Sequence, residues 1–204
     1  MTLSTILNGP TLVGIAIAYL FGSISSAIII CKLWHLPDPR TTGSRNPGAT
    51  NVLRVGGKLP ALLTLLGDAL KGVIPVFVAQ RYGLTPEGVA LIAFAVFLGH
   101  LYPIFFRFEG GKGVATALGC LFVLSWPVAL LWVVNWLILA YLFRYSSLAA
   151  IVATFIAPFD LLLFQAPLAY CYGMFSIALM LIVRHRTNMI NLWHGTERKI
   201  GKTK

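Results

Sequence analysis

The longest stretches without charge constrain this chain more than any other feature of its sequence. Residues 1–31 and 113–143 contain no Asp, Glu, Lys or Arg, and residues 145–183 contain only Asp160. About 20 apolar residues suffice to cross the hydrocarbon core of a bilayer as a helix. A typical soluble domain is about 25% charged, whereas this chain is 11% charged and 58% hydrophobic. The sequence therefore predicts an all-α fold, a polytopic transmembrane helical bundle that forms one integral-membrane domain over residues 1–204.

The expected number of spans is about seven, with five as the alternative. The first three spans are expected from Pro10 to Cys31, from Leu59 to Val78 and from Val89 to Phe106. A helix over residues 113–143 would be about 45 Å long, which exceeds the roughly 30 Å core, so we divide this run near Pro127. The run over residues 145–183 is longer still and is divided around Pro158 and Pro167. If either or both of these runs cross as one tilted helix, the alternative of five applies.

The basic residues orient the bundle. Of the 16 Lys and Arg, 14 lie in segments that a seven-span path places on one side, eight between spans and six from Arg184 onward. Since cytoplasmic segments carry an excess of Lys and Arg, we expect the N-terminus outside and the C-terminus in the cytoplasm. The net charge of +10 does not indicate a nucleic-acid partner, because the basic groups lie in short segments between apolar runs and form no solvated face.

The first internal segment, from Thr42 to Arg54, concentrates hydroxyls, amides and glycines. Glycine lets a backbone approach a ligand closely, and an arginine guanidinium matches the geometry of phosphate or carboxylate. We therefore expect a binding segment for such a group, with a tight turn capped by Asn and Ser as the alternative. Its candidate residues are Ser44, Asn46, Gly48, Asn51 and Arg54.

The second internal segment reads Phe-Glu-Gly-Gly-Lys-Gly-Val-Ala-Thr over residues 108–116. Backbone N–H groups at a helix N-terminus, with Lys112 as a point charge, favour an anion. The segment is not a Walker A loop, because glycine follows Lys112 where that motif needs Ser or Thr. We expect a phosphate cradle, with a glycine hinge as the alternative. Its candidate residues are Gly110, Gly111, Lys112, Gly113 and Thr116.

The third internal segment starts with Arg-His-Arg-Thr-Asn over residues 184–188. His185 and Asn188 are three residues apart and therefore share one helix face. A basic cluster that only stops translocation would need charge and no such pair. Ser147, at another internal turn, is expected to reach the same site.

Two charged residues, Asp68 and Lys71, stand three positions apart inside the second span. Intramembrane charges are costly and usually paired, so we expect a structural ion pair, with a substrate contact as the alternative. His100 is expected to be a packing residue. Carboxylates are too scarce for a metal-dependent phosphotransferase, since Mg²⁺ sites generally need one or two of them. We therefore expect no metal site and no cofactor.

These segments closely resemble the PlsY family of bacterial membrane acyltransferases, which pass a fatty acyl group from acyl phosphate to glycerol 3-phosphate. The resemblance spans essentially the whole chain and includes four motifs in order. They are Gly-Ser-x-Asn-x-Gly-Ala-Thr-Asn-Val-Leu-Arg (43–54), Gly-His-x-Tyr-Pro-x-Phe-Phe (99–106), Gly-Gly-Lys-Gly-Val-Ala-Thr (110–116) and Arg-His-x-x-Asn (184–188). Two residues beside the motifs depart from the family pattern, namely Arg45 and Glu109.

The resemblance implies a role for each motif. The residues expected to be catalytic are Ser44, Arg54, Lys112, His185 and Asn188. The residues expected to bind substrate or phosphate are Asn46, Gly48, Asn51, Gly110, Gly111, Gly113, Thr116 and Ser147. The residues expected to be structural are Asp68, Lys71 and Glu197.

The function that the resemblance implies is the first step of phospholipid synthesis, in which the 1-hydroxyl of glycerol 3-phosphate attacks acyl phosphate to give lysophosphatidate and inorganic phosphate. The expected partners are these two substrates, membrane lipid and, functionally, the enzyme that makes acyl phosphate. The expected location is the bacterial inner membrane, with the active site facing the cytoplasm. The alternative is a small carrier for an organic phosphate, which would be expected to place polar groups near the bilayer midplane, often with internal repeats.

Overall fold

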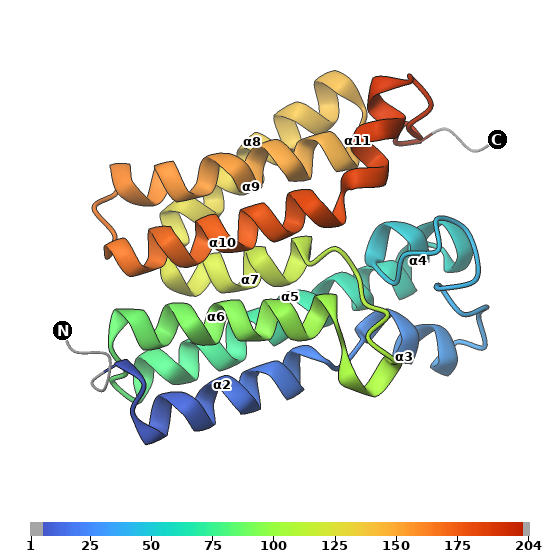
Figure 1. Ribbon diagram of the computed structural model, residues 1–204. Coiled ribbons are helices and arrows are strands. Elements are labelled where there is room, and N and C mark those ends of the chain that lie inside the picture. The colour runs from blue at the N-terminus through green and yellow to red at the C-terminus, as the bar shows by residue number, and fades with distance from the viewer. Residues whose placement is uncertain (1–5, 202–204) are drawn as a thin grey trace.

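The computed structural model describes residues 6–201, and over this range the ordered elements are helices without a β-strand (Figure 1). This confirms the predicted all-helical fold. The helices are α2 (Gly9–Gly22), α3 (Ser26–Leu33), α4 (Ala49–Gly56), α5 (Lys58–Arg81), α6 (Pro86–Leu101), the short 3₁₀ helix η1 (Ile104–Phe106), α7 (Val114–Leu124), α8 (Trp126–Phe143), α9 (Ser146–Leu163), α10 (Leu168–Arg184) and α11 (Arg186–Trp193).

The described residues hold five helical segments that are long and apolar enough to cross a membrane, or six if a bent pair is counted as one span. The five are α2 with α3, α5, α6 with η1, α8, and α9. The bent pair is α10 with α11, which meet at 58°. The expected fourth span, α7, has 11 residues, so it is only about 16 Å long and too short to cross alone. All seven expected segments are helical, but the number of candidate spans is five or six.

The breaks fall close to the expected prolines, with one exception. Residues 113–143 divide at Ser125, and Pro127 lies in the first turn of α8, where proline is tolerated because its missing N–H has no helical partner. Residues 145–183 divide just before Pro167, whereas Pro158 lies inside α9. A proline inside a membrane helix is tolerated when its neighbours satisfy the freed backbone group. The run over residues 145–183 is therefore divided at Pro167 but not at Pro158.

The first span is not one continuous helix, since α2 ends at Gly22 and α3 begins at Ser26. The hydroxyl of Ser23 donates to the carbonyl of Tyr19 (2.8 Å), and the break leaves the carbonyl of Ile24 without a helical donor. The ammonium of Lys71 on α5 donates to that carbonyl (2.8 Å). The buried lysine thus satisfies a backbone group that would be costly to leave unpaired in lipid.

Glycines allow the helices to approach closely at two crossings. A methyl group at Gly22 of α2 would overlap the backbone of Val96 on α6, and one at Gly99 of α6 would overlap the backbone of Tyr19. Similarly, Gly72 of α5 lies against the backbone of α7. Small residues at such interfaces let backbones meet where lipid offers no hydrophobic drive for association. The α2–α6 and α5–α7 contacts form one half of the bundle, and α8, α9 and α10 form the other (Figure 1).

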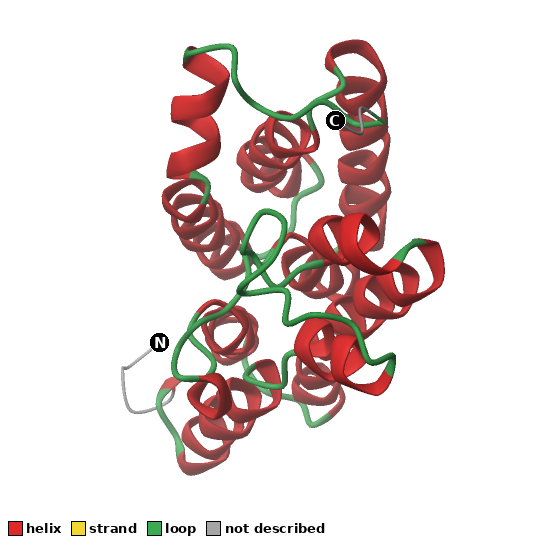
Figure 2. Ribbon diagram, turned by 90° about the vertical axis from the view of Figure 1, so that its right-hand side faces the viewer, coloured by secondary structure: helices red, strands yellow, loops and turns green. Residues whose placement is uncertain are grey.

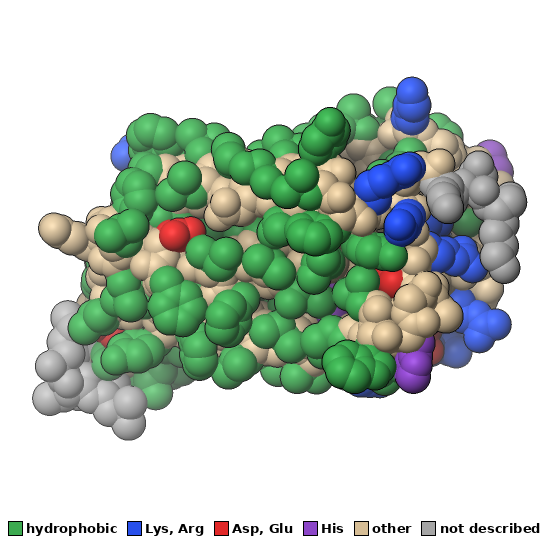
Figure 3. All heavy atoms as spheres, turned by 90° about the horizontal axis from the view of Figure 1, so that it is seen from above, with side chains coloured by type: hydrophobic (Ala, Val, Ile, Leu, Met, Phe, Trp, Pro, Cys, Tyr) green, Lys and Arg blue, Asp and Glu red, His purple; other side chains and the backbone are tan. Residues whose placement is uncertain are grey.

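The polar segments gather at one end of the bundle. Apolar side chains cover the length of the face seen in Figure 3, while Lys and Arg side chains cluster at the end that holds α4 and α11 (Figure 1, Figure 3). Figure 2 looks onto this end, where the connecting loops converge over the helix ends. The turn at Arg144 lies there too, because its carbonyl accepts from the N–H of Ile200 (2.7 Å). The alternating path of the seven segments is therefore present in the structure.

Candidate active site

A chain of hydrogen bonds joins the second and third internal segments. Nζ of Lys112 donates to Oδ1 of Asn188 (2.5 Å), and Nδ2 of Asn188 donates to Oε1 of Glu197 (2.6 Å). The same oxygen accepts from the hydroxyl of Ser147 (2.6 Å) at the start of α9. Four residues from three separate segments of the chain thus form one network, in which Asn188 orients the ammonium and Glu197 orients Asn188.

The glycine loop, defined here as Gly110–Gly113, is held by a residue of α10. The guanidinium of Arg184 donates to the carbonyls of Gly110 (2.7 Å) and Gly111 (3.2 Å) and lies 5.5 Å from the ring centre of Tyr102. Gly113 has a positive φ of 82°, and a methyl group there would overlap Phe97. The loop therefore needs glycine to pack against α6.

The first internal segment is organised by Asn51, on the first turn of the short helix α4. Its buried Nδ2 donates to the carbonyls of Pro39 (2.8 Å) and Thr42 (3.0 Å), and its Oδ1 accepts from the N–H of Ser44 (2.8 Å). The Ser44 loop, defined as Pro39–Gly48, is thus pinned to α4 by one side chain. The expected substrate-binding role of Asn51 does not suit an amide whose bonds all go to backbone, and we assign it a positioning role.

The electrostatics of the site centre on Lys112. Burial lowers the pKa of Lys112 below its ordinary value of 10.5, and the nearby positive charges of Arg184 and Arg54 lower it further. The negative charge of Glu197 acts in the opposite direction. These couplings place Arg54 of α4 within electrostatic reach of the lysine. The result is a half-buried cation with two other cations and one carboxylate nearby, and the net positive charge of this group favours the binding of an anion.

His185 lies at the junction of α10 and α11 and is 2% exposed. Its Nδ1 lies 2.8 Å from the carbonyl of Leu181, and a carbonyl can only accept, so in the neutral ring Nδ1 carries the proton. Nε2 is then the atom with a free lone pair. A free lone pair on a neutral ring is one of the features that a general base requires.

A second charged cluster lies inside the bundle, below the glycine loop. Nζ of Lys71 lies 3.1 Å from Oδ1 of Asp68, and Nδ1 of His100 lies 3.7 Å from the same oxygen. The side chains of Asp68 and Lys71 are 4% and 5% exposed, so the structure has the intramembrane pair that the sequence suggested. The expected phosphate ligand Thr116 faces this cluster, where its buried hydroxyl donates to the carbonyl of Asp68 (2.9 Å). That hydroxyl therefore joins α7 to α5 rather than pointing into the loop.

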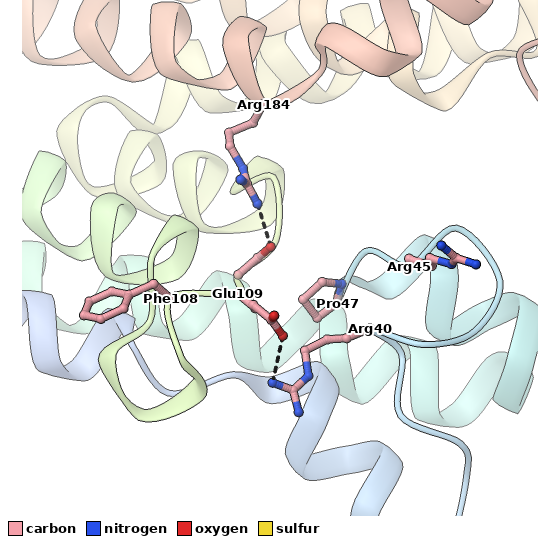
Figure 4. Close-up of a pocket in the computed structure, with 7 residues that line it drawn as sticks. Arg40, Arg45, Pro47, Phe108, Glu109 and Arg184 are labelled. Atoms are coloured by element: carbon pink, nitrogen blue, oxygen red, sulfur yellow. Dashed lines mark hydrogen bonds and ion pairs between the residues drawn. The ribbon is translucent and has the colours of Figure 1, made fainter.

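A cavity of about 320 Å³ opens on the other side of the glycine loop (Figure 4). Figure 4 shows Arg40 reaching toward Glu109, and the two groups are 3.3 Å apart. Arg40 also binds Asp38 at 2.7 Å, while the guanidinium of Arg45 points away from the other charged groups (Figure 4). The residues that line the cavity are Arg40, Arg45, Pro47, Phe108, Glu109, Gly110 and Arg184.

Comparison with known proteins identifies the family. A family model described as glycerol-3-phosphate acyltransferase matches residues 12–195. A glycerol-3-phosphate acyltransferase of Herminiimonas arsenicoxydans is 52% identical over 191 residues, covering 92% of this chain and 93% of the relative. One of Methylobacillus flagellatus is 54% identical over 185 residues, covering 91% and 94%. A crystal structure of PlsY, an integral membrane glycerol 3-phosphate acyltransferase, in its glycerol 3-phosphate form is 41% identical, has a TM-score of 0.91 and covers 95% of this chain and 96% of that chain. The chain belongs to the PlsY family.

A second crystal structure of PlsY, in its lysophosphatidic acid form, has a TM-score of 0.86 at 40% identity and covers the same shares of the two chains. The glycerol 3-phosphate form and the lysophosphatidic acid form of PlsY therefore both share the architecture of this chain. Membership of the PlsY family agrees with the resemblance carried by the motifs, and with the helical membrane bundle predicted from the charge-free runs.

The structure brings together some of the expected residues of the PlsY site and separates others. Lys112, Asn188, Glu197 and Ser147 form one network, and Arg54 lies close enough to influence Lys112. Ser44 lies on the exposed part of the Ser44 loop, and within the described range neither it nor Asn46 makes a hydrogen bond to the Lys112 network. Gly48 caps the start of α4.

Sequence reasoning did not assign Arg184, Tyr102 or Arg40 to the site. Arg184 belongs to the third motif, but a basic residue at the end of a span is also what the positive-inside rule expects. Its position directly before His185 was the only signal. Nothing in the sequence indicates that its guanidinium reaches two carbonyls that lie more than 70 residues earlier in the chain.

The arrangement suits chemistry between two anions. It offers cations, backbone amides at the start of α7 and a buried imidazole with a free Nε2. Among residues 6–201, no group of three or more His, Cys, Asp and Glu side chains is placed to hold a metal ion. Fixed donors that hold substrates and stabilise developing negative charge are the groups on which an acyl transfer relies.

Proposed function

We propose that this chain transfers a fatty acyl group from acyl phosphate to the 1-hydroxyl of glycerol 3-phosphate, giving lysophosphatidate and inorganic phosphate. The observation that carries the proposal is the Lys112–Asn188–Glu197–Ser147 network beside the glycine loop, in a chain of the PlsY family. Glycerol 3-phosphate and lysophosphatidic acid are the molecules named in the two PlsY structures. The resemblance of the motifs and the cationic character of the site support acyl phosphate as the donor.

The residues divide the reaction between binding and proton transfer. Lys112, Arg54 and the N–H groups of the first turn of α7 hold the phosphates, the hydroxyl of Ser44 orients the reacting groups, and the amide of Asn188 orients the Lys112 ammonium. The 1-hydroxyl oxygen forms a bond to the acyl carbon, and the bond from that carbon to the phosphate oxygen breaks. The hydroxyl proton passes to Nε2 of His185 or to a phosphate oxygen, and phosphate leaves with the bonding electrons.

We further propose that the site faces the cytoplasm of a bacterial inner membrane, with the N-terminus outside, the C-terminus inside and residues 1–204 acting as one domain. The support is the concentration of Lys and Arg at the end that holds α4 and α11 (Figure 3). At this end the protein meets water-soluble glycerol 3-phosphate and lipid together. A functional link to the enzyme that makes acyl phosphate fits this placement, because that product partitions into the same membrane face.

The test is phosphate release by the purified protein in detergent or lipid. Acyl phosphate and glycerol 3-phosphate are supplied with EDTA, and acyl-CoA replaces acyl phosphate in a parallel reaction. We expect phosphate and lysophosphatidate in equal amounts from the first reaction and no lysophosphatidate from the second. Lys112→Met should abolish turnover, while Lys58→Met, at an exposed lysine that begins α5, should retain it.

Three outcomes would contradict the proposal. Turnover with acyl-CoA alone would refute the donor. Full activity of Lys112→Met would remove the network from the site. If the folded protein turned over neither donor, the carrier alternative would have to be tested by uptake of glycerol 3-phosphate into vesicles. The position of the site at one end of the bundle argues against a carrier, whose binding groups would be expected near the midplane.

A further inference from the structure

The buried cluster of Asp68, Lys71 and His100 takes no part in the reaction described above. Its three side chains come from α5 and α6 and are between 4% and 7% exposed. Lys71 has a structural role, since it pairs with Asp68 (3.1 Å) and donates to the Ile24 carbonyl at the helix break (2.8 Å). His100 has no comparable partner, because its Nδ1 lies 3.7 Å from Asp68, beyond hydrogen-bond distance.

His100 instead meets the glycine loop through both its backbone and its ring. Its carbonyl accepts from the N–H of Gly111 (3.2 Å). A methyl group at Gly111 would overlap Nε2 of the ring, and one at Gly110 would overlap the carbonyl of His100. The imidazole edge that faces away from Asp68 therefore lies directly against the loop backbone.

The same glycine also touches the Ser44 loop. A methyl group at Gly111 would lie 2.9 Å from the carbonyl oxygen of Pro47, which is a buried residue. Gly111 is thus enclosed, on the face where a side chain would stand, by both the His100 ring and the Pro47 backbone. Lys112, the next residue, projects from this enclosed point toward Asn188.

We infer that His100, oriented by the charge of Asp68, is a positioning residue that sets the distance between the glycine loop and the Ser44 loop. This inference rests on the proposed function, since those two loops carry Lys112 and Ser44. The ring lies between Gly111 and Asp68 and prevents the glycine loop from moving toward the interior of the bundle. Without it the backbone amides and Lys112 shift relative to Ser44, and a misplacement of about 1 Å can reduce a rate by about 10²-fold.

The test compares three replacements of one ring. His100→Ala removes all support, His100→Asn keeps only the atoms that face Asp68, and His100→Gln extends an amide to the position of Nε2. We expect kcat/KM for glycerol 3-phosphate to fall by about tenfold or more in the Ala and Asn variants, and by clearly less in the Gln variant, since only Gln reaches Gly111. The amide of Gly111 should exchange hydrogen faster in the Ala variant, measured on a peptide that covers residues 109–113.

A matched control separates positioning from general loss of stability. Thr154→Val removes a buried hydrogen bond from Trp132 (3.1 Å) in the middle of the α8–α9 pair. It should lower Tm without changing kcat/KM or the exchange of Gly111. Asp68→Asn should act in the same direction as His100→Ala, and the double variant should lose less than the product of the two single losses, because coupled residues are not additive.

The inference is overturned if the Asn and Gln variants are equally active, or if the loss in His100→Ala is matched by Thr154→Val at the same drop in Tm. It is also overturned if Gly111 exchanges at the wild-type rate in His100→Ala. Failure of the wild-type protein to turn over would instead refute the proposed function. The exchange measurement needs no activity and still tests the contact.

Discussion

Replacing Glu197 by Gln tests the network at its most connected atom. Oε1 of Glu197 accepts two short hydrogen bonds, from Ser147 and Asn188, and Oε2 faces the amide of Asn191 at 3.4 Å. Glutamine keeps the shape of the side chain but removes its charge. If the glutamine oxygen occupies the Oε1 position, the bonds from Ser147 and Asn188 are kept as neutral bonds. The glutamine NH₂ group then faces the NH₂ group of Asn191, so two donors meet and that bond is lost.

The expected loss follows from the difference between charged and neutral bonds. A hydrogen bond to a charged group contributes about 1.5–3 kcal/mol to stability and a neutral one about 0.5–1.5 kcal/mol. The change costs about 1 kcal/mol per bond, and therefore about 2 kcal/mol for the two. In a protein of about 200 residues, 1 kcal/mol shifts Tm by about 2–4 °C. Glu197→Gln should therefore lower Tm by about 4–8 °C, and Glu197→Ala, which loses all three hydrogen bonds of the carboxylate, by more.

The assay is thermal unfolding in detergent, read together with the pH profile of kcat/KM. Because the Glu197 charge raises the pKa of Lys112, its removal should move the alkaline loss of activity to lower pH. Glu109→Gln is the control, since that carboxylate is 63% exposed and pairs with Arg40 at the surface, where such pairs contribute at most about 1 kcal/mol. An unchanged Tm and an unchanged alkaline limb in Glu197→Gln would refute the reasoning.

Three further predictions follow from the site. Burial and the charges of Arg184 and Arg54 lower the pKa of Lys112 below 10.5, so activity should fall as pH rises through this lowered pKa. The free energy of unfolding should rise with pH between the lowered pKa and 10.5, because in that range the unfolded chain binds more protons than the folded protein. Lys112→Arg should extend the active range to higher pH, as measured by kcat/KM profiles. Arg184→Lys keeps the charge but loses the guanidinium fork that holds the glycine loop, so the KM for glycerol 3-phosphate should rise by about tenfold in steady-state assays, since an interaction of about 1.4 kcal/mol is lost. Asn51→Ala removes three hydrogen bonds of about 1 kcal/mol each, so Tm should fall and kcat should fall with it; full activity at unchanged Tm would show that the Ser44 loop does not depend on Asn51.

The fold could be predicted to the level of its helical segments because charge-free runs and prolines are local signals. Division of residues 113–143 near Pro127 was confirmed at Ser125. Neither the break between Gly22 and Ser26 nor the continuity of α9 through Pro158 could be predicted in the same way. The break depends on a donor that comes from another helix, since Lys71 of α5 donates to the carbonyl of Ile24. An apolar composition alone does not make a membrane span, since α7 is apolar but has only 11 residues, about half the number needed to cross the hydrocarbon core.

The site could be predicted as a set of residues but not as a set of roles. The motifs assigned Lys112 and Asn188 to one site, and in the structure the two side chains are in direct contact. It also selected Asn51 and Thr116 as ligands, whereas the hydrogen bonds of both side chains go to backbone carbonyls or N–H groups inside the protein. Residue type and motif membership are the same for a ligand and for the residue that supports it. Only the partners of each polar atom distinguish the two.

The glycine loop shows why that distinction matters for the mechanism. From the sequence, three glycines around a lysine indicate a backbone that approaches a phosphate. In the structure, Gly110, Gly111 and Gly113 are also the residues at which a methyl group would overlap α6. Close approach to a phosphate and close packing against α6 both require residues without a side chain in this loop. A loop that is packed tightly from below by α6 and held by Arg184 keeps its amides and Lys112 fixed before substrate arrives, and such pre-organisation is what lets fixed donors stabilise a developing charge without reorganising.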